Sequence, residues 1–251
     1  MRAWLTINRR RKIYERKYTA LVQRSLKIQI APIIDELATR KPSQIEVILD
    51  PEPIKKAFGL LYPDTGRAFA QVTHRELTGK ALKDDLTSVW DNEMRAFMEM
   101  HAGERITSIT GSSKEIAMRI LKDLGMRVIP EGLSIEEATR LLQSEFKKRY
   151  IETTIARARV IAQTEILTAS NKGSSMGALE AGATIKEWQT SGIASPDGKD
   201  RHIAYPGLHG QVRAIGEKYD VGGYPADYPG DPTLPAGEVV NCKCAEIYKI
   251  Q

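Results

Sequence analysis

The sequence has few cysteines, few aromatic residues and no long apolar run. Two cysteines in 251 residues are too few for the disulfide framework of a small secreted protein. An aromatic share of 6% favours a helix-rich core of Leu, Ile, Val and Ala. No stretch approaches the roughly 18–20 apolar residues that span a bilayer, and the first residues lack the apolar core of a signal peptide. We therefore expect no membrane contact and a protein made and kept in a cytoplasm.

Several nucleotide and hydrolase motifs are also missing. There is no Gly-x-Gly-x-x-Gly after a strand and no Gly-x-x-x-x-Gly-Lys-Ser/Thr loop to hold phosphates. No nucleophile elbow is present either. The sequence therefore gives no support to a dinucleotide-dependent transferase or to a serine hydrolase. Hydrophobic and charged shares of 41% and 27% are ordinary for a globular chain of one large or two modest domains.

Positive charge is concentrated near the start of the chain. The formal net charge is +5, and the densest basic run lies in the first predicted helix. Such a run is either a solvated helix face or a surface that contacts phosphate or an acidic partner, because Lys and Arg bind phosphate through charge alone. No aromatic residues alternate with it as single-strand binding requires. The candidate contact residues are Arg9, Arg10, Arg11, Lys12, Arg16 and Lys17.

Apolar spacing predicts a mainly helical chain up to Gly182. The first helix is expected from Asn8, as its N-cap, to Arg40, with a break near residues 29–31 caused by Pro32. Residues 44–49 alternate between apolar and polar, which suits a short strand, a loop or a helix start. Further helices are predicted over 51–61, 65–77 after a turn at 62–65, 81–101, 112–124, 134–150 and 152–180. Capping boxes at Ser112 and Ser134 and a stop at Gly79 support these limits.

The composition changes after Gly182. Residues 184–190 predict a strand, and about fifty residues rich in Gly, Pro and Asp follow, with a turn of helix suggested over 211–218. Residues 229–237 should form a stiff loop, and residues 238–250 a closing strand that pairs with 184–190. The predicted fold is α+β and predominantly helical, with a helical region over 1–150 and a small loop-rich domain over 151–251 that has a long entry helix.

Both cysteines fall in the closing segment. Residues two apart on a strand share a face, so Cys242 and Cys244 are expected side by side. Together with His202 and His209 they could supply four ligands to a structural zinc ion. The Cys-x-Cys spacing is tighter than the usual Cys-x₂–₄-Cys of zinc sites, so an alternative stays open in which the thiols fill a small apolar space.

Glu165 is predicted in the middle of a helix face that is otherwise small and apolar. A carboxylate there is costly unless it has a partner. We expect it to tie the entry helix to the closing loop, for example through Arg201 or a backbone amide near Asp231. This is a structural role rather than a catalytic one.

Five stretches of the last hundred residues form an ordered set of motifs. They are Ala158–Glu165 with Asn171 and Gly173; Lys186–Trp188 with Thr190–Gly192; Asp200–Arg201; Leu208–Gly210; and the close, Pro229-Gly-Asp-Pro, Pro235-Ala-Gly-Glu and Asn241-Cys-Lys-Cys244. Together they resemble the Mu F-like head morphogenesis family of tailed phages. The polar middle departs from the family pattern, because Tyr205 stands where that family usually has a histidine three residues before Leu-x-Gly, and His202 lies nearby.

This resemblance implies a structural minor head protein and not an enzyme. Such a protein would act in head assembly at or near the portal vertex inside the capsid, and in DNA packaging or ejection. Its implied partners are the portal protein, the major capsid protein and packaged DNA, with several copies around the portal. The virion would be its final location, after assembly in the host cytoplasm.

An enzyme is the competing hypothesis. Asp200-Arg-His202 followed by a Pro-Gly loop superficially resembles the metal-dependent ββα nucleases. The alternative function is therefore a metal-dependent nuclease, or a toxin-like enzyme, that uses the His and Cys residues of the C-terminal domain. This hypothesis requires His202, His209 and both cysteines to converge on one ion with an open coordination position.

Overall fold

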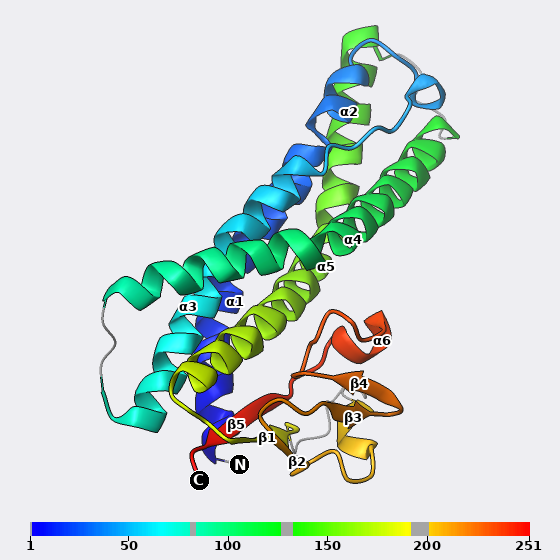
Figure 1. Ribbon diagram of the computed structural model, residues 1–251. Coiled ribbons are helices and arrows are strands. Elements are labelled where there is room, and N and C mark those ends of the chain that lie inside the picture. The colour runs from blue at the N-terminus through cyan, green and yellow to red at the C-terminus, as the bar shows by residue number, and fades with distance from the viewer. Residues whose placement is uncertain (1, 81–83, 127–132, 192–200) are drawn as a thin grey trace. The chain divides into compact units, whose positions relative to one another are not determined.

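The computed structural model describes residues 2–80, 84–126, 133–191 and 201–251 (Figure 1). Helices predominate in the described residues up to 180, and short strands and loops follow. The predicted fold class, α+β and predominantly helical, is confirmed. No helix in the described ranges is both long and apolar enough to cross a membrane. The helices are α1 Arg2–Gln29, α2 Ala31–Glu36, α3 Glu52–Thr78, α4 Asp84–Gly125, α5 Ile135–Glu180 and α6 Ala236–Val239, with single 3-10 turns at Pro42–Gln44 and Arg201–Ala204.

The first predicted helix breaks where expected but begins earlier. Ile30 separates α1 from α2, and Pro32 lies in the first turn of α2, where its missing N–H costs nothing. The predicted N-cap at Asn8 is wrong, because α1 already begins at Arg2. Trp4, buried in this first turn, supplies the tertiary packing that extends the helix past a residue suited to cap it.

Helix α3 runs through Pro63, so the predicted turn at residues 62–65 is wrong. A proline cannot donate to the carbonyl four residues earlier, which here is that of Gly59. Arg95 Nη1 donates to that oxygen over 3.4 Å, and Tyr18 Oη donates to the neighbouring carbonyl of Leu60 over 3.0 Å. The carbonyls near the interruption thus find side-chain donors, and the helix continues.

Helix α4 is also continuous where two helices were predicted. It passes through Gly103 and Gly111, and Ser112 does not cap a new helix. Its Oγ instead donates to the carbonyl of Ser108 over 2.8 Å, as serines inside helices do. The second capping box is confirmed: Ser134 N donates to Glu137 Oε2 and Glu137 N donates to Ser134 Oγ, over 2.9 and 3.2 Å. The helix that it opens, α5, does not end at Tyr150 but reaches Glu180.

The chain forms two compact units built from interleaved segments. The mixed unit contains Met1–Thr19, Phe58–His101 and Val160–Gln251. The helical unit contains Ala20–Ala57 and Ala102–Arg159. The predicted boundary between residues 150 and 151 falls inside α5, which is continuous there.

In the helical unit, buried apolar side chains recur along the helices. They include Leu26, Ile33, Phe146 and Tyr150. Residues 45–50 form no strand, but they are extended enough to bury alternate side chains: Ile45, Val47 and Leu49 point inward while their neighbours are exposed. The alternation seen in the sequence therefore reports burial rather than sheet pairing.

In the mixed unit, α5 and α3 meet through residues without bulky side chains. A Cβ atom added to Gly173 would lie 2.1 Å from the carbonyl oxygen of Gly66, and one added to Gly177 would lie 2.1 Å from that of Ala70. Small residues that recur four positions apart on each helix let the two helices approach backbone to backbone. The two glycines are therefore a requirement of this packing.

The mixed unit also contains a three-stranded antiparallel sheet of order β2-β1-β5 and a separate β3-β4 hairpin. Pairing between the first and last strands is confirmed, with Trp188 opposite Glu246. The helical turn suggested over 211–218 is wrong, because that segment holds β2. The closing strand is shorter than predicted, since α6 and a turn precede it. The strands are β1 Ile185–Gln189, β2 Val212–Ala214, β3 Tyr219–Val221, β4 Tyr224–Ala226 and β5 Ala245–Lys249.

Candidate metal centre

Two cysteine thiols and one histidine ring meet in the mixed unit. Cys242 and Cys244 lie in the turn between α6 and β5, and His202 comes from the 3-10 turn at Arg201–Ala204. His202 Nδ1 lies 3.3 Å from Cys242 Sγ and 3.4 Å from Cys244 Sγ. The three donor atoms all lie within 4.8 Å of one another, so this group could hold a metal ion.

A tight turn, and not the alternation of a strand, brings the thiols together. Asn241 has a positive φ of 63°, a conformation that asparagine tolerates better than most residues. Cys242 N donates to the carbonyl of Val239 over 3.2 Å, and Cys244 N donates to Cys242 Sγ over 3.4 Å. The cysteines are side by side as expected, but they precede β5 instead of lying on it.

The surroundings of the group are nonpolar on one side. His202 is 1% exposed, Cys244 is fully buried, and the Trp188 ring meets the His202 ring edge-on at 5.9 Å. Burial by itself raises the pKa of the Cys242 thiol, but hydrogen bonds from Cys244 and His202 outweigh it and lower the pKa to about 6. The thiolate form of Cys242 is therefore populated near neutral pH, and the thiolate is the form that binds metal.

A second layer of residues orients the histidine ring. Glu238 Oε2 lies 3.0 Å from His202 Nε2, and Tyr205 Oη donates to the same carboxylate over 3.0–3.1 Å. In the tautomer whose Nε2–H donates to Glu238, Nδ1 carries the lone pair that a metal ion requires. A carboxylate behind a ligating histidine is the usual arrangement of protein zinc sites. Tyr205, where the family resemblance departs, thus belongs to this outer layer, and His202 is the residue that reaches the thiols.

His209 does not join the group. The backbone N–H of Thr190 donates to His209 Nδ1 over 3.2 Å, and the Thr190 hydroxyl lies 3.0 Å from the same nitrogen. In the described part of the chain, the group that could hold a metal consists of His202, Cys242 and Cys244. The predicted set of four metal ligands is therefore wrong in one member, His209. The sequence could not separate the two histidines, because both lie in the same loop-rich stretch.

Arg11, predicted as a nucleic-acid contact, is buried and turned inward. It is 3% exposed, and its guanidinium donates to Ser170 Oγ, Asn171 Oδ1 and the carbonyl oxygen of Cys244. Burial lowers the pKa of Arg11 to about 10, while the neighbouring thiolates act in the opposite direction. Within a run of four basic residues, the sequence contained no sign that the third would face the core.

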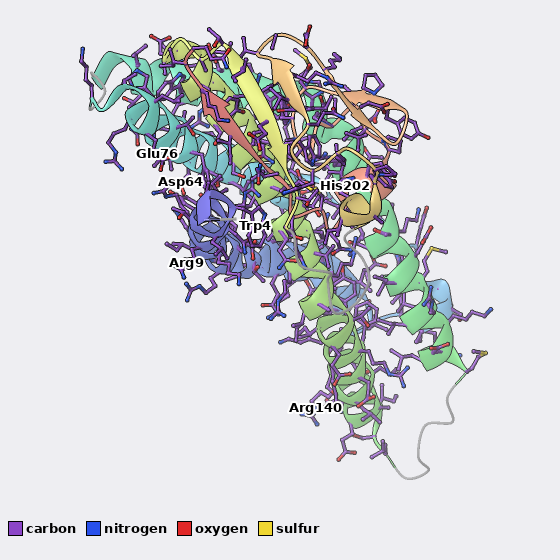
Figure 2. The ribbon with its side chains drawn as sticks, turned by 90° about the horizontal axis from the view of Figure 1, so that it is seen from below. Trp4, Arg9, Asp64, Glu76, Arg140 and His202 are labelled. Carbon is purple, nitrogen blue, oxygen red and sulfur yellow. The ribbon has the colours of Figure 1, made fainter. Side chains whose placement is uncertain are left out.

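The other members of the basic run are distributed around α1. Arg9, Lys12 and Arg16 are exposed, and Arg10 is partly buried. Lys17 pairs with Asp64 over 2.8 Å. Figure 2 shows Arg9 pointing outward on one side of α1 and Trp4 on another. Lys17 is exposed too, but Asp64 offsets its charge, so Arg9, Lys12 and Arg16 carry the remaining basic face.

The entry helix is tied to the closing loop through Thr168 and Asn171. Glu165 accepts a hydrogen bond from Tyr62 Oη, while Thr168 Oγ1 donates to the carbonyl of Gly230 and Asn171 Nδ2 to that of Pro229, over 2.8 and 2.7 Å. Asp231 shapes the loop itself by accepting from the amides of Asp227 and Thr233. The side chain of Arg201 and residues 192–200, including Gly192 and Asp200, lie outside the described residues.

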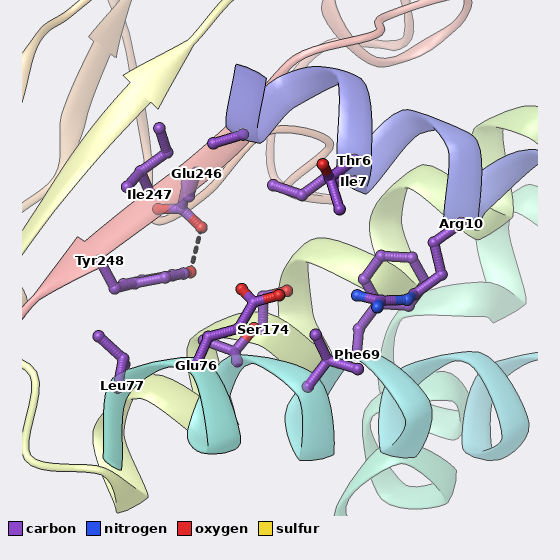
Figure 3. A pocket seen from close by; sticks show the side chains of 13 residues that line it. Thr6, Ile7, Arg10, Phe69, Glu76, Leu77, Ser174, Glu246, Ile247 and Tyr248 are labelled. Atoms are coloured by element: carbon purple, nitrogen blue, oxygen red, sulfur yellow. Dashed lines mark hydrogen bonds between the residues drawn. The ribbon is translucent and has the colours of Figure 1, made fainter. Parts of the chain in front are cut away.

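A cavity of about 330 Å³ lies in the mixed unit near β5 (Figure 3). Residues of α1, α3, α5 and β5 line it, among them Arg10, Glu76 and Glu246. Tyr248 Oη donates to Glu246 Oε2, and burial raises the pKa of Glu246 to about 7. The cavity does not include the thiols or His202.

No family model, curated protein or solved structure matches this chain. The resemblance to the Mu F-like family therefore depends on the residues that carry it.

Proposed function

We propose that this chain is a structural minor head protein of the Mu F-like type, acting in head assembly inside the capsid near the portal vertex. The observation that carries the proposal is convergence. Residues from two stretches of the resemblance meet at one place, because Asn171 donates to the carbonyls of Pro229 and Cys244, over 2.7 and 3.4 Å. His202, which follows a third stretch, contacts both thiols of the close. These contacts support the proposal because they join motif residues that are far apart in the chain.

A structural zinc ion held by His202, Cys242 and Cys244 belongs to this proposal. A tetrahedral zinc with ordinary bond lengths places its sulfur and nitrogen ligands about 3.5 Å apart. The observed separations of 3.3 and 3.4 Å need almost no change. When bound, the ion cross-links the Arg201–Ala204 turn to the segment before β5. A loop-rich stretch with a small core gains most from such a cross-link.

The exposed face of α1 is the proposed contact with packaged DNA. Arg9, Lys12 and Arg16 recur at intervals of three and four residues, so they share one face of the helix. Contacts of this kind are made to phosphate and carry no sequence preference. The portal and major capsid proteins remain the proposed protein partners, with several copies of the chain around the portal.

Quantitative mass spectrometry of purified mature particles, scaled to the portal protein, tests the proposal. A fixed low ratio of this chain to the portal is the expected result. Absence from finished particles would contradict a structural role in the virion and leave a transient assembly factor or an unrelated enzyme.

The enzyme hypothesis makes a different prediction. It predicts all four His and Cys side chains around one ion with an open coordination position. His209 instead contacts Thr190, and the three remaining donors would leave the fourth position of a tetrahedral zinc open. Metal analysis and a phosphodiesterase assay of the purified protein separate the two hypotheses. One bound zinc without activity agrees with a structural site, whereas activity that depends on an added divalent ion would overturn the non-enzymatic proposal.

A further inference from the structure

The turn that carries the two cysteines is held from behind by the first helix of the chain. Trp4 Nε1 donates to the carbonyl oxygen of Lys243 over 2.7 Å, and Arg11 Nη1 donates to that of Cys244 over 2.8 Å. The two donors are 5% and 3% exposed. Both consecutive carbonyls of the turn therefore accept hydrogen bonds from buried side chains of α1, while the thiols face His202.

The geometry of the peptide bond links these carbonyls to the thiols. The carbonyl of Lys243 and the N–H of Cys244 belong to the same planar group, which is trans, so the two bonds point in opposite directions. Trp4 fixes the direction of that carbonyl and thereby directs the Cys244 N–H toward Cys242 Sγ, 3.4 Å away. A donor on the carbonyl also polarises the peptide group and strengthens the bond that its N–H makes to sulfur.

Arg11 acts on the next carbonyl and adds a positive charge. Its planar guanidinium donates to three acceptors at once, two of them on α5, so the Arg11 side chain has little freedom to move. Asn171 accepts from Arg11 and donates to the carbonyl of Cys244, which closes the arrangement. The backbone of Cys244 is thus fixed by α1 and α5 together, and its thiol is aimed at His202 Nδ1.

We infer that Trp4 and Arg11 are positioning residues for the metal site, and that metal binding and the docking of α1 stabilise each other. The inference rests on the zinc site proposed above. Linkage between two binding events is reciprocal, so whatever weakens the hold of α1 on the turn weakens the metal to the same extent. The basic face of α1 is consequently held most firmly when the metal is bound.

Zinc affinity of the full chain, measured by competition with a chromophoric chelator, tests the role of Trp4. Trp4→Phe keeps the aromatic bulk and removes the Nε1 donor, and we expect it to bind zinc about tenfold more weakly, as loss of outer-shell partners usually does. The matched control is Tyr18→Phe, which removes a buried hydroxyl of the same helix that bonds to Leu60 and Asp64, away from the turn. Its zinc affinity should stay within about twofold of the natural chain. Equal affinities for the natural chain and Trp4→Phe, or equal losses in both variants, would overturn the inference.

Hydrogen exchange of the unmodified chain gives the reciprocal measurement. Backbone amides of residues 4–19 should exchange about tenfold more slowly with zinc than after chelation. Amides of residues 86–101 in α4, which belong to the same unit, report whether the whole unit loosens. Zinc bound at one ion per chain with no change in α1 refutes the linkage alone. Failure to take up any zinc refutes the metal proposal and, with it, this inference.

Discussion

The helical unit and the mixed unit use buried polar side chains very differently. Among the described residues of the helical unit, the buried polar side chains are Ser25, Gln29, Ser113 and Thr154, all on helices. The mixed unit buries many more, including charged ones, and several bond to backbone carbonyls of its loops. A helix satisfies its own backbone, whereas a loop leaves carbonyls and amides that need other partners. The difference shows that the loops of the mixed unit depend on directed bonds between distant segments, in addition to apolar packing.

Loss of the metal should produce the largest difference in stability between the two units. We expect Cys244→Ser to abolish stoichiometric zinc binding and to remove about 4 kcal/mol of stabilisation from the mixed unit when zinc exceeds its dissociation constant a thousandfold. His209→Asn is the control, because His209 contacts Thr190 and should leave zinc content unchanged. Thermal unfolding with and without zinc measures the effect. Equal zinc loss in both variants would contradict the three-residue site.

Helix packing gives the next effect. Gly173→Ala inserts a methyl group 2.1 Å from the carbonyl oxygen of Gly66, and we expect it to lower the free energy of unfolding by about 3 kcal/mol. Gly103→Ala, in the helical unit, meets no atom within 4 Å and should stabilise α4 by about 0.5–1 kcal/mol because alanine favours helix. Urea unfolding of the two variants compares them. A Gly173→Ala variant as stable as the natural chain would mean that α3 and α5 are not this close.

The orientation of His202 should matter less than the ligands themselves. Glu238→Ala removes the acceptor at Nε2, and we expect zinc affinity to fall about tenfold, which is about 1.4 kcal/mol. Tyr205→Phe removes a donor to that carboxylate but leaves the carboxylate in place, so it should cost less zinc affinity. Chelator competition measures both. A larger loss of zinc affinity for Tyr205→Phe than for Glu238→Ala would contradict an arrangement in which Tyr205 acts on His202 through Glu238.

The exposed basic face should affect stability least. Replacing Arg9, Lys12 and Arg16 by alanine should change the free energy of unfolding by less than about 0.5 kcal/mol for each site, because all three are exposed. Duplex DNA binding should weaken. The slope of the logarithm of the binding constant against the logarithm of the salt concentration should become shallower by up to about 3. Titrations at several salt concentrations measure this. Unchanged DNA binding would assign the face to solvent or to a protein partner.

Local signals predicted several features correctly. The break at Pro32, the stop at Gly79, the capping box at Ser134 and the pairing of the first and last strands all follow from short-range sterics and side-chain patterns. Errors arose where tertiary contacts overrode those signals. Pro63 is accommodated in α3 because Arg95 and Tyr18 supply donors from other segments, and Asn8 does not cap α1 because Trp4 is buried beyond it.

Only part of the candidate site could be predicted. The Cys-x-Cys pair and His202 were identifiable from residue type, since thiols and imidazoles are the ligands that zinc prefers. Two facts were not: that His209 lies elsewhere, and that Glu238 stands behind His202. Both depend on how the loops close, and the closure is governed by contacts among residues far apart in the chain.

The sequence alone therefore determined that a mainly helical part precedes the strands, the sites of several helix ends and the supply of metal-binding side chains. These features depend on backbone sterics and on periodic burial within a few turns of chain. The tertiary structure decided which polar groups meet. Trp4 reaches a carbonyl 239 positions away and Arg11 one 233 positions away. No local pattern encodes such a pairing, because a hydrogen bond depends on where the whole fold places its donor and acceptor.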